Sequence, residues 1–124
     1  MNLLLADDDE DTVALLELLL TRQGWRVICA ASVREAQEAL GREAVDVVLS
    51  DYNLGDGLGT ALFGDARPAS VRLALLVSGA CEQISGALLT SAHFDRCLSK
   101  PVEPRTLLQL LQPLLAAPPS PEPT

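Results

Sequence analysis

Aromatic residues are scarce in this chain, at 3% of 124 positions. Because hydrophobic residues still make up 48%, the core of a single domain has to be built from leucine, valine and alanine. No apolar stretch approaches the roughly 20 residues of a membrane-spanning helix. The leucines near the N-terminus also lack the preceding basic segment of a secretory signal. We therefore expect a cytoplasmic protein that does not insert into membranes.

Histidine and cysteine are also rare. The only histidine is His93, and the three cysteines, Cys29, Cys81 and Cys97, have no metal-ligand spacing. An odd number of cysteines in a cytoplasmic protein favours reduced structural thiols over a metal or redox site. We therefore expect three free thiols.

Basic residues are outnumbered by acidic ones, which gives a net charge of -8. A protein that binds nucleic acid needs a basic face to neutralise phosphates. We therefore expect no direct nucleic-acid binding, so any output directed at DNA would need a partner or a further domain.

Strand and helix patterns alternate along the chain. Apolar runs predict strands at residues 3–6, 25–30, 45–50, 72–78 and 96–99. Helical patterns predict helices that end near residue 23 and cover residues 33–40, 60–66, 82–91 and 104–115. Residues 1–115 then form one domain. Residues 116–124 hold four prolines and are expected to be disordered or a linker.

Several residues mark the expected helix ends. Gly24 is a C-terminal cap, Ser32 and Glu35 have the spacing of a capping box, and Gly41 is expected to end the second helix. Gly86 falls inside the fourth predicted helix and should weaken it.

Five strand–helix units with almost continuously apolar strands indicate a parallel sheet covered on both faces. The expected fold is α/β and flavodoxin-like, a doubly wound (βα)5 sheet with strand order 2-1-3-4-5. Strands 1 and 3 then flank the switch point, where Asp7, Asp8 and Asp51 should meet. Ser78 and Lys100 approach from strands 4 and 5.

Four segments carry a resemblance to a known family: LLADDD at 4–9, DVVLSD at 46–51 followed by LGDGLG at 54–59, VSG at 77–79, and LSKP at 98–101. In their order and spacing they resemble the receiver domain of two-component response regulators. The resemblance covers residues 2–115. It implies that the Lys100–Pro101 peptide bond is cis.

The resemblance also implies a magnesium site. Asp8 and Asp51 would bind Mg²⁺ directly, together with the main-chain carbonyl of Asn53, and Asp7 would act through water. An octahedron of oxygens that keeps several waters is the coordination that Mg²⁺ prefers. The remaining acids of the run, residues 9–11, are expected on solvated surface or at a helix N-terminus.

Phosphoryl transfer is the chemistry that the resemblance implies. Asp51 would accept the phosphoryl group from a phosphohistidine of a histidine kinase or phosphotransfer protein. Lys100 and Ser78 would each contact a phosphoryl oxygen, and slow self-dephosphorylation would be the only further activity. Taken alone, Asp51 could instead cap a helix and Ser78 could serve a turn.

The chain departs from the family in places that concern its output. Cys97 stands where relatives usually have the aromatic residue of the switch, Gly55 replaces a proline, and His93 and Phe94 replace Gly-Ala. Relatives often use the surface of segments 82–91, 96–99 and 104–115 for homodimerisation or partner binding. That surface is a candidate here for a homodimer or an unknown downstream protein, although its sequence is atypical.

Two alternatives stay open. A pseudo-receiver, an interaction module that switches without phosphorylation, is favoured by Cys97, Gly55 and the atypical helix at 82–91. It is opposed by the intact acids and Lys100. A Mg²⁺-dependent phosphohydrolase with an aspartate nucleophile usually has Asp-x-Asp, whereas Asp51 is followed by Tyr52 and Asn53. The chain could be a complete regulator or part of a longer regulator or hybrid kinase.

Overall fold

The computed structural model describes residues 1–116 and contains five strands and four α-helices in that range. The strands are β1 (Asn2–Ala6), β2 (Arg26–Ala30), β3 (Val47–Asp51), β4 (Leu73–Ser78) and β5 (Arg96–Ser99). The helices are α1 (Glu10–Arg22), α2 (Val33–Arg42), α3 (Gly86–Ser91) and α4 (Pro104–Ala116), with short 3₁₀ turns η1 (Gly59–Ala61) and η2 (Cys81–Gln83). The predicted tail lies, from residue 117 on, outside the described residues. No helix within residues 1–116 has the length and apolar character that crossing a membrane requires.

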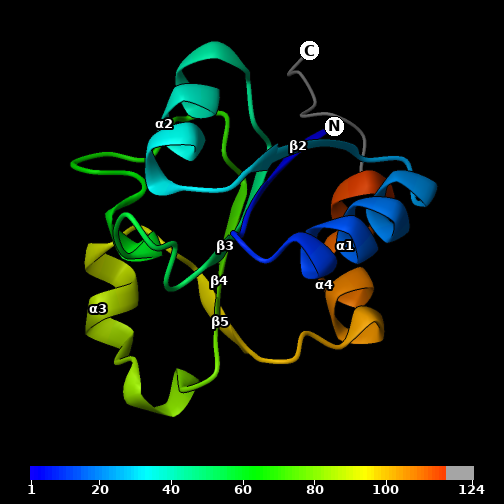
Figure 1. Ribbon diagram of the computed structural model, residues 1–124. Helices are drawn as coiled ribbons and strands as arrows, with labels where there is room; N and C mark the ends of the chain where they lie inside the picture. The colour runs from blue at the N-terminus through cyan, green and yellow to red at the C-terminus, as the bar shows by residue number, and fades with distance from the viewer. Residues whose placement is uncertain (117–124) are drawn as a thin grey trace.

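All strands are parallel and lie in the order β2-β1-β3-β4-β5, which confirms the predicted flavodoxin-like fold. Helices α1 and α4 cover one face of the sheet, and α2 and α3 cover the other (Figure 1). Ser78 lies opposite Ser99, and Asp51 lies opposite Val77. The carboxyl ends of the central strands therefore meet at one edge of the sheet.

Alternate strand residues divide the core into two layers. Leu3 and Leu5 of β1 pack on the side of α1 and α4, whereas Leu4 and Ala6 pack on the side of α2 and α3. This period of two is what a strand buried on both faces requires. It also decides the side to which each residue at the functional edge points.

The N-terminus of α1 uses part of the acidic run. The Asp9 carboxylate accepts hydrogen bonds from the Asp11 backbone N–H at 3.2 Å and from the Thr12 hydroxyl at 2.7 Å. An acidic cap satisfies free N–H groups and suits the positive end of the helix dipole. The expected helix-terminal role of residues 9–11 is confirmed. Gly24, at φ 103°, follows the end of the helix.

The predicted capping of α2 is only partly correct. The Ser32 hydroxyl accepts from the Glu35 N–H at 3.0 Å, but the Glu35 carboxylate accepts from the Ala31 N–H rather than from that of Ser32. The helix also continues past Gly41 to Arg42. Gly41 does not have a positive φ, and a Cβ added to it would meet no atom within 4 Å. This glycine therefore does not interrupt the helix.

Two predicted helices are shorter than expected. Residues 60–66 form only the single turn η1, since Gly64 adopts a left-handed φ of 59° that a helix does not allow. The segment 82–91 divides into η2 and α3. The Ser85 hydroxyl caps α3 by accepting from the Leu88 N–H at 3.0 Å, so Gly86 is the first helical residue. The prediction that Gly86 lies inside the helix and weakens it is therefore wrong.

The turn before β5 explains one departure from the family. His93 has a left-handed φ of 68°, a conformation that glycine adopts most easily. Its ring Nε2 lies 3.1 Å from the Asp65 carbonyl oxygen. Phe94 is buried and its ring centroid lies 5.2 Å from that of Phe63. The Phe94 side chain is therefore part of the core.

The prediction of three free thiols is wrong for two of them. Cys81 of η2 and Cys97 of β5 form a disulfide with a Cα–Cα separation of 5.8 Å, and Cys29 is free. The spacing of the two cysteines along the chain did not indicate a pair, because they belong to different elements. They become neighbours only when β5 pairs with β4.

Candidate functional site

Three carboxylates meet where β1 and β3 end. Asp7 and Asp8 follow β1, Asp51 is the last residue of β3, and one oxygen from each lies within 4.8 Å of the others. Asp7 and Asp51 are only 7% and 6% exposed, whereas Asp8 is open to solvent. The predicted carboxylate cluster is therefore present, and its donor set suits a hard divalent cation.

Lys100 supplies the positive charge of the cluster. It follows β5, and its Nζ lies 2.9 Å from Asp51 Oδ1, with the lysine side chain 44% exposed. Partial burial disfavours the ammonium charge, but the hydrogen bond and charge of Asp51, helped by Asp7 and Asp8, outweigh it and raise the pKa of Lys100. The lysine is therefore held charged beside Asp51.

The carboxyl group of Asp7 is affected most by the crowding of the three acids. Burial, followed by the charges of Asp51 and Asp8, raises the pKa of the Asp7 carboxyl, although the Asp9 N–H at 2.9 Å and Lys100 act in the opposite direction. One ammonium group does not fully compensate three carboxylates. A bound cation would relieve the remaining repulsion.

Ser78 reaches the same sheet edge, at the end of β4. Its hydroxyl oxygen accepts from the Ala80 N–H at 3.0 Å, and its carbonyl accepts from the Lys100 N–H at 3.0 Å. Ser78 therefore does serve the turn after β4, the alternative role that its sequence position suggested. Within residues 1–116 the hydroxyl has no hydrogen bond to Asp51, so its predicted contact with a phosphoryl oxygen stays a prediction.

Asn53 begins the loop after β3. Its backbone N–H lies 3.5 Å from Asp51 Oδ1, and its side-chain oxygen accepts from the Gly55 N–H at 3.1 Å. Gly55 has φ 84°, and a Cβ there would lie 3.6 Å from Asp8 Oδ2. Proline, which fixes φ near −65°, does not fit this loop, which accounts for glycine at the position.

Gly59 has a role that the sequence reasoning missed. Its N–H donates to the Tyr52 carbonyl at 2.6 Å, and a Cβ on it would overlap the Asp51 carbonyl oxygen and lie 2.8 Å from Ser50 Oγ. Only glycine lets the loop close this tightly against the strand that carries Asp51. Its place in the LGDGLG segment was the available signal.

Asp56 was also missed. Its two carboxylate oxygens accept from the backbone N–H groups of Val33 at 2.8 Å and Arg34 at 3.2 Å. These hydrogen bonds, that from Val33 first, lower the pKa of Asp56. The loop after Asp51 is thereby tied to the N-terminus of α2.

A cleft of about 380 Å³ opens beside the carboxylates. Asp7, Asp51 and Lys100 form its polar end, and Leu15 of α1 and Val102 belong to its apolar wall. An anionic group entering this cleft would meet the ammonium group, and a metal ion the carboxylates.

The comparisons with known proteins agree with this geometry. The sequence model of the response regulator receiver domain matches residues 3–112. The chain is therefore a member of the receiver domain family of two-component response regulators, a family of signalling domains.

Individual relatives show the same family. The transcriptional regulatory protein GlrR of Escherichia coli K12 is 33% identical over 115 residues, covering 92% of this chain and 26% of GlrR. An uncharacterised 14.6 kDa protein of Leptolyngbya boryana is 35% identical over 124 residues, covering 96% of this chain and 94% of its own. The chain thus spans about a quarter of GlrR but nearly all of the second relative.

Solved structures give the same fold. The CheY-like receiver domain protein from Methanospirillum hungatei superposes with a TM-score of 0.81 at 28% identity, covering 92% of each chain. The Lys100–Pro101 peptide bond is cis, as the resemblance implied.

Proposed function

We propose that the chain accepts a phosphoryl group from a phosphohistidine of a histidine kinase or phosphotransfer protein onto Asp51, in a Mg²⁺-dependent reaction, and signals by a conformational change. The observation that carries this proposal is the Lys100–Asp51 contact of 2.9 Å beside the acids Asp7 and Asp8. Asp51 is almost buried and lines the cleft beside Lys100.

In this proposal Asp8 and Asp51 hold the cation directly, the Asn53 carbonyl supplies a third protein oxygen, and Asp7 acts through water. The cation supplies positive charge that neutralises the phosphoryl oxygens and the acids. Asp7 suits a water-mediated role because its Oδ1 already accepts from the Asp9 N–H.

An oxygen of Asp51 attacks phosphorus while the bond from phosphorus to the histidine nitrogen breaks. Lys100 then exchanges its contact with Asp51 Oδ1 for one with a phosphoryl oxygen, which keeps its charge paired throughout. The Ser78 hydroxyl can donate to another phosphoryl oxygen because it uses only its acceptor capacity on Ala80. Moving Ser78 would pull on the loop that follows β4 and so begin the conformational change.

Labelling with acetyl phosphate and Mg²⁺, followed by intact-mass measurement, tests this proposal. The wild type should gain one acid-labile phosphoryl group, and Asp51→Asn should gain none. The matched control is Asp46→Asn, a change of an acid that directly precedes β3, at the end of the strand remote from Asp51. Equal labelling of wild type and Asp51→Asn would overturn the assignment.

A pseudo-receiver is the second candidate, and the Cys81–Cys97 disulfide favours it because it occupies the expected switch position. Absence of labelling together with a melting temperature that ignores Mg²⁺ would support this alternative. We further propose a cytoplasmic location and a protein, rather than nucleic acid, as the direct output partner. A phosphohydrolase is disfavoured because Asn53 stands where the second carboxylate would be.

A further inference from the structure

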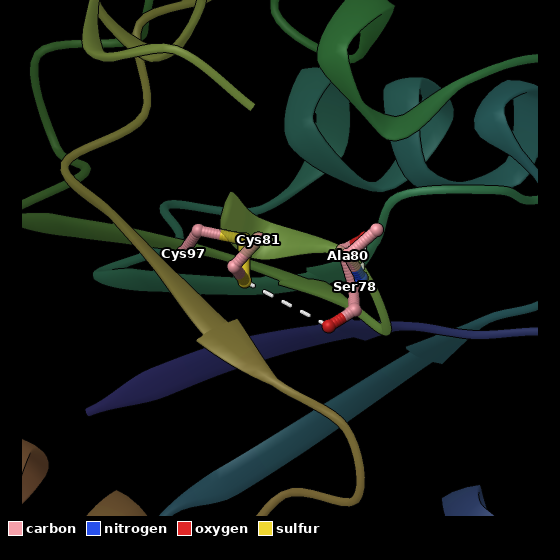
Figure 2. The surroundings of a disulfide bond; sticks show 4 residues. All are labelled: Ser78, Ala80, Cys81 and Cys97. Atoms are coloured by element: carbon pink, nitrogen blue, oxygen red, sulfur yellow. Dashed lines mark hydrogen bonds between the residues drawn. A yellow bond between two sulfur atoms is a disulfide. The ribbon is translucent and has the colours of Figure 1, made fainter. Parts of the chain in front are cut away.

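The disulfide lies on the α3 side of the sheet, next to the functional edge. Cys97 is the second residue of β5 and lies opposite Leu76 of β4, while Cys81 begins η2, three residues after Ser78. Figure 2 shows the two cysteines joined above the end of β4. A Cα–Cα separation of 5.8 Å lies within the range that a disulfide spans without backbone movement.

Both sulfur-bearing residues are partly open to solvent. The loop that holds Cys81 crosses the surface between β4 and α3, and Cys97 lies on β5, the edge strand of the sheet. The pair therefore lies near the surface of the domain and not in its core. Cys29, by contrast, lies on β2 at the other edge and forms no disulfide.

A short chain of contacts links this disulfide to Asp51. Cys81 Sγ lies 3.7 Å from the Ser78 carbonyl oxygen (Figure 2). The same carbonyl accepts from the Lys100 N–H at 3.0 Å, and Lys100 Nζ lies 2.9 Å from Asp51. Cys81 therefore contacts the same Ser78 carbonyl that accepts a hydrogen bond from Lys100, one of the residues proposed to hold the phosphoryl group.

Within residues 79–84, the loop after β4 is held by local hydrogen bonds and one apolar contact. The Ala80 N–H donates to the Ser78 hydroxyl, and the Ile84 N–H donates to the Cys81 carbonyl, while the Ile84 side chain packs against the core. The disulfide adds a covalent link from Cys81 to β5. Breaking it would free the loop to move relative to the sheet, together with the Ser78 hydroxyl that it positions.

We propose that Cys81 and Cys97 form a reversible redox site that controls how Ser78 responds to phosphorylation of Asp51. In the disulfide form the tether to β5 limits how far Ser78 and its loop move toward a phosphoryl oxygen, and in the dithiol form the loop follows the Ser78 hydroxyl without that limit. The control function rests on the proposed phosphorylation of Asp51, whereas the redox site itself does not.

The oxidant belongs to the class of small disulfides such as oxidised glutathione. The thiolate of one cysteine attacks a sulfur of the reagent, which forms a mixed disulfide and releases one thiol. The thiolate of the second cysteine then attacks the mixed disulfide, which closes the Cys81–Cys97 bond and releases a second thiol. Two protein thiols are oxidised, and one small disulfide is reduced to two small thiols.

The redox site is tested without phosphorylation. The full chain is reduced, equilibrated in glutathione buffers of increasing oxidised fraction, quenched with a maleimide and weighed intact. Maleimide incorporation should fall from three to one in wild type and from two to none in Cys29→Ser, in a single step. Cys81→Ser and Cys97→Ser should show no intramolecular loss of thiols. Retention of all three thiols in fully oxidised glutathione would overturn the redox site.

The control function is tested by repeating the titration in the presence of Mg²⁺ and of beryllofluoride, which mimics the phosphoryl group. Binding that favours a mobile loop should move the midpoint at least threefold toward the dithiol form, and Ser78→Ala should abolish the shift. By linkage, beryllofluoride should bind the disulfide form at least threefold more weakly.

The outcomes separate the two proposals. If acetyl phosphate labels Asp51 equally well in both redox states and beryllofluoride leaves the midpoint unchanged, redox control is wrong and the proposed function stands. If Asp51 is labelled in neither state, the proposed function and its control both fail. The glutathione titration still decides whether the redox site exists.

Discussion

Reducing the Cys81–Cys97 disulfide should lower the free energy of unfolding substantially. The bond closes a loop with a sequence separation of 16. Closing a loop of that size reduces the conformational entropy of the unfolded chain, which stabilises the folded state by about 3 kcal/mol at 25 °C. Unfolding entropy is about 2.1 cal/mol/K per residue. For this chain, reduction should therefore lower the melting temperature by roughly 12 °C.

Thermal and urea denaturation with and without a phosphine reductant measure the effect. With a urea m-value of about 2 kcal/mol/M, the midpoint should fall by roughly 1.5 M on reduction. Cys29→Ser should respond like wild type, because its thiol lies outside the disulfide. The double variant Cys81→Ser/Cys97→Ser should melt near reduced wild type and ignore the reductant.

Two results would refute this reasoning. A melting temperature that changes by less than about 3 °C on reduction would correspond to under 1 kcal/mol, which means that the unfolded chain gains little freedom when the loop opens. An equal response of the double variant would show that the reductant acts elsewhere.

Three further predictions address the site and its loop. Mg²⁺ at millimolar concentration should raise the melting temperature of the wild type, because only the folded chain brings the acids together. Asp8→Ala should abolish this rise. The same rise in Asp8→Ala as in wild type would mean that the cation binds elsewhere. Gly59→Ala should lower the free energy of unfolding by about 1–3 kcal/mol, because the added Cβ would overlap the main chain at the end of β3. In the same urea denaturation, the control Gly86→Ala, where the added Cβ meets no atom, should be neutral or stabilising. Equal effects of the two substitutions would contradict the close approach at Gly59. Asp56→Ala should lower the melting temperature at pH 7 but not in strong acid, because the lowered pKa of Asp56 gives stability that is present above pH 3.8 and lost as pH falls through the folded-state pKa. Thermal melts from pH 7 to pH 2 test this, with Asp65→Asn as control. A difference in melting temperature between Asp56→Ala and wild type that stayed constant with pH would contradict the prediction.

The strand framework was predictable because its signal is local. The central strands β1, β3 and β4 are each built on an apolar run, and the acids at 7, 8 and 51 come at the ends of the first two. Once the strand order is known, the meeting of these acids follows from geometry alone. Lys100 is predictable for the same reason, as it comes one residue after β5.

The parts that were missed depend on contacts between distant segments. Cys81 and Cys97 pair only through the β4–β5 register, and Asp56 caps a helix 23 residues away in sequence. Gly64 ended a predicted helix by adopting a backbone angle that glycine permits but does not require. Local patterns contain none of this information.

The closed ring of residues 81–97 has a consequence for proteolysis. It contains α3 and the turn at His93, both connected to the rest of the chain through the disulfide as well as through the backbone. A protease that cuts once inside the ring leaves two fragments still covalently joined. They would run as one species on a denaturing gel and separate only after a reductant is added, so a single nick in α3 would go unnoticed under oxidising conditions.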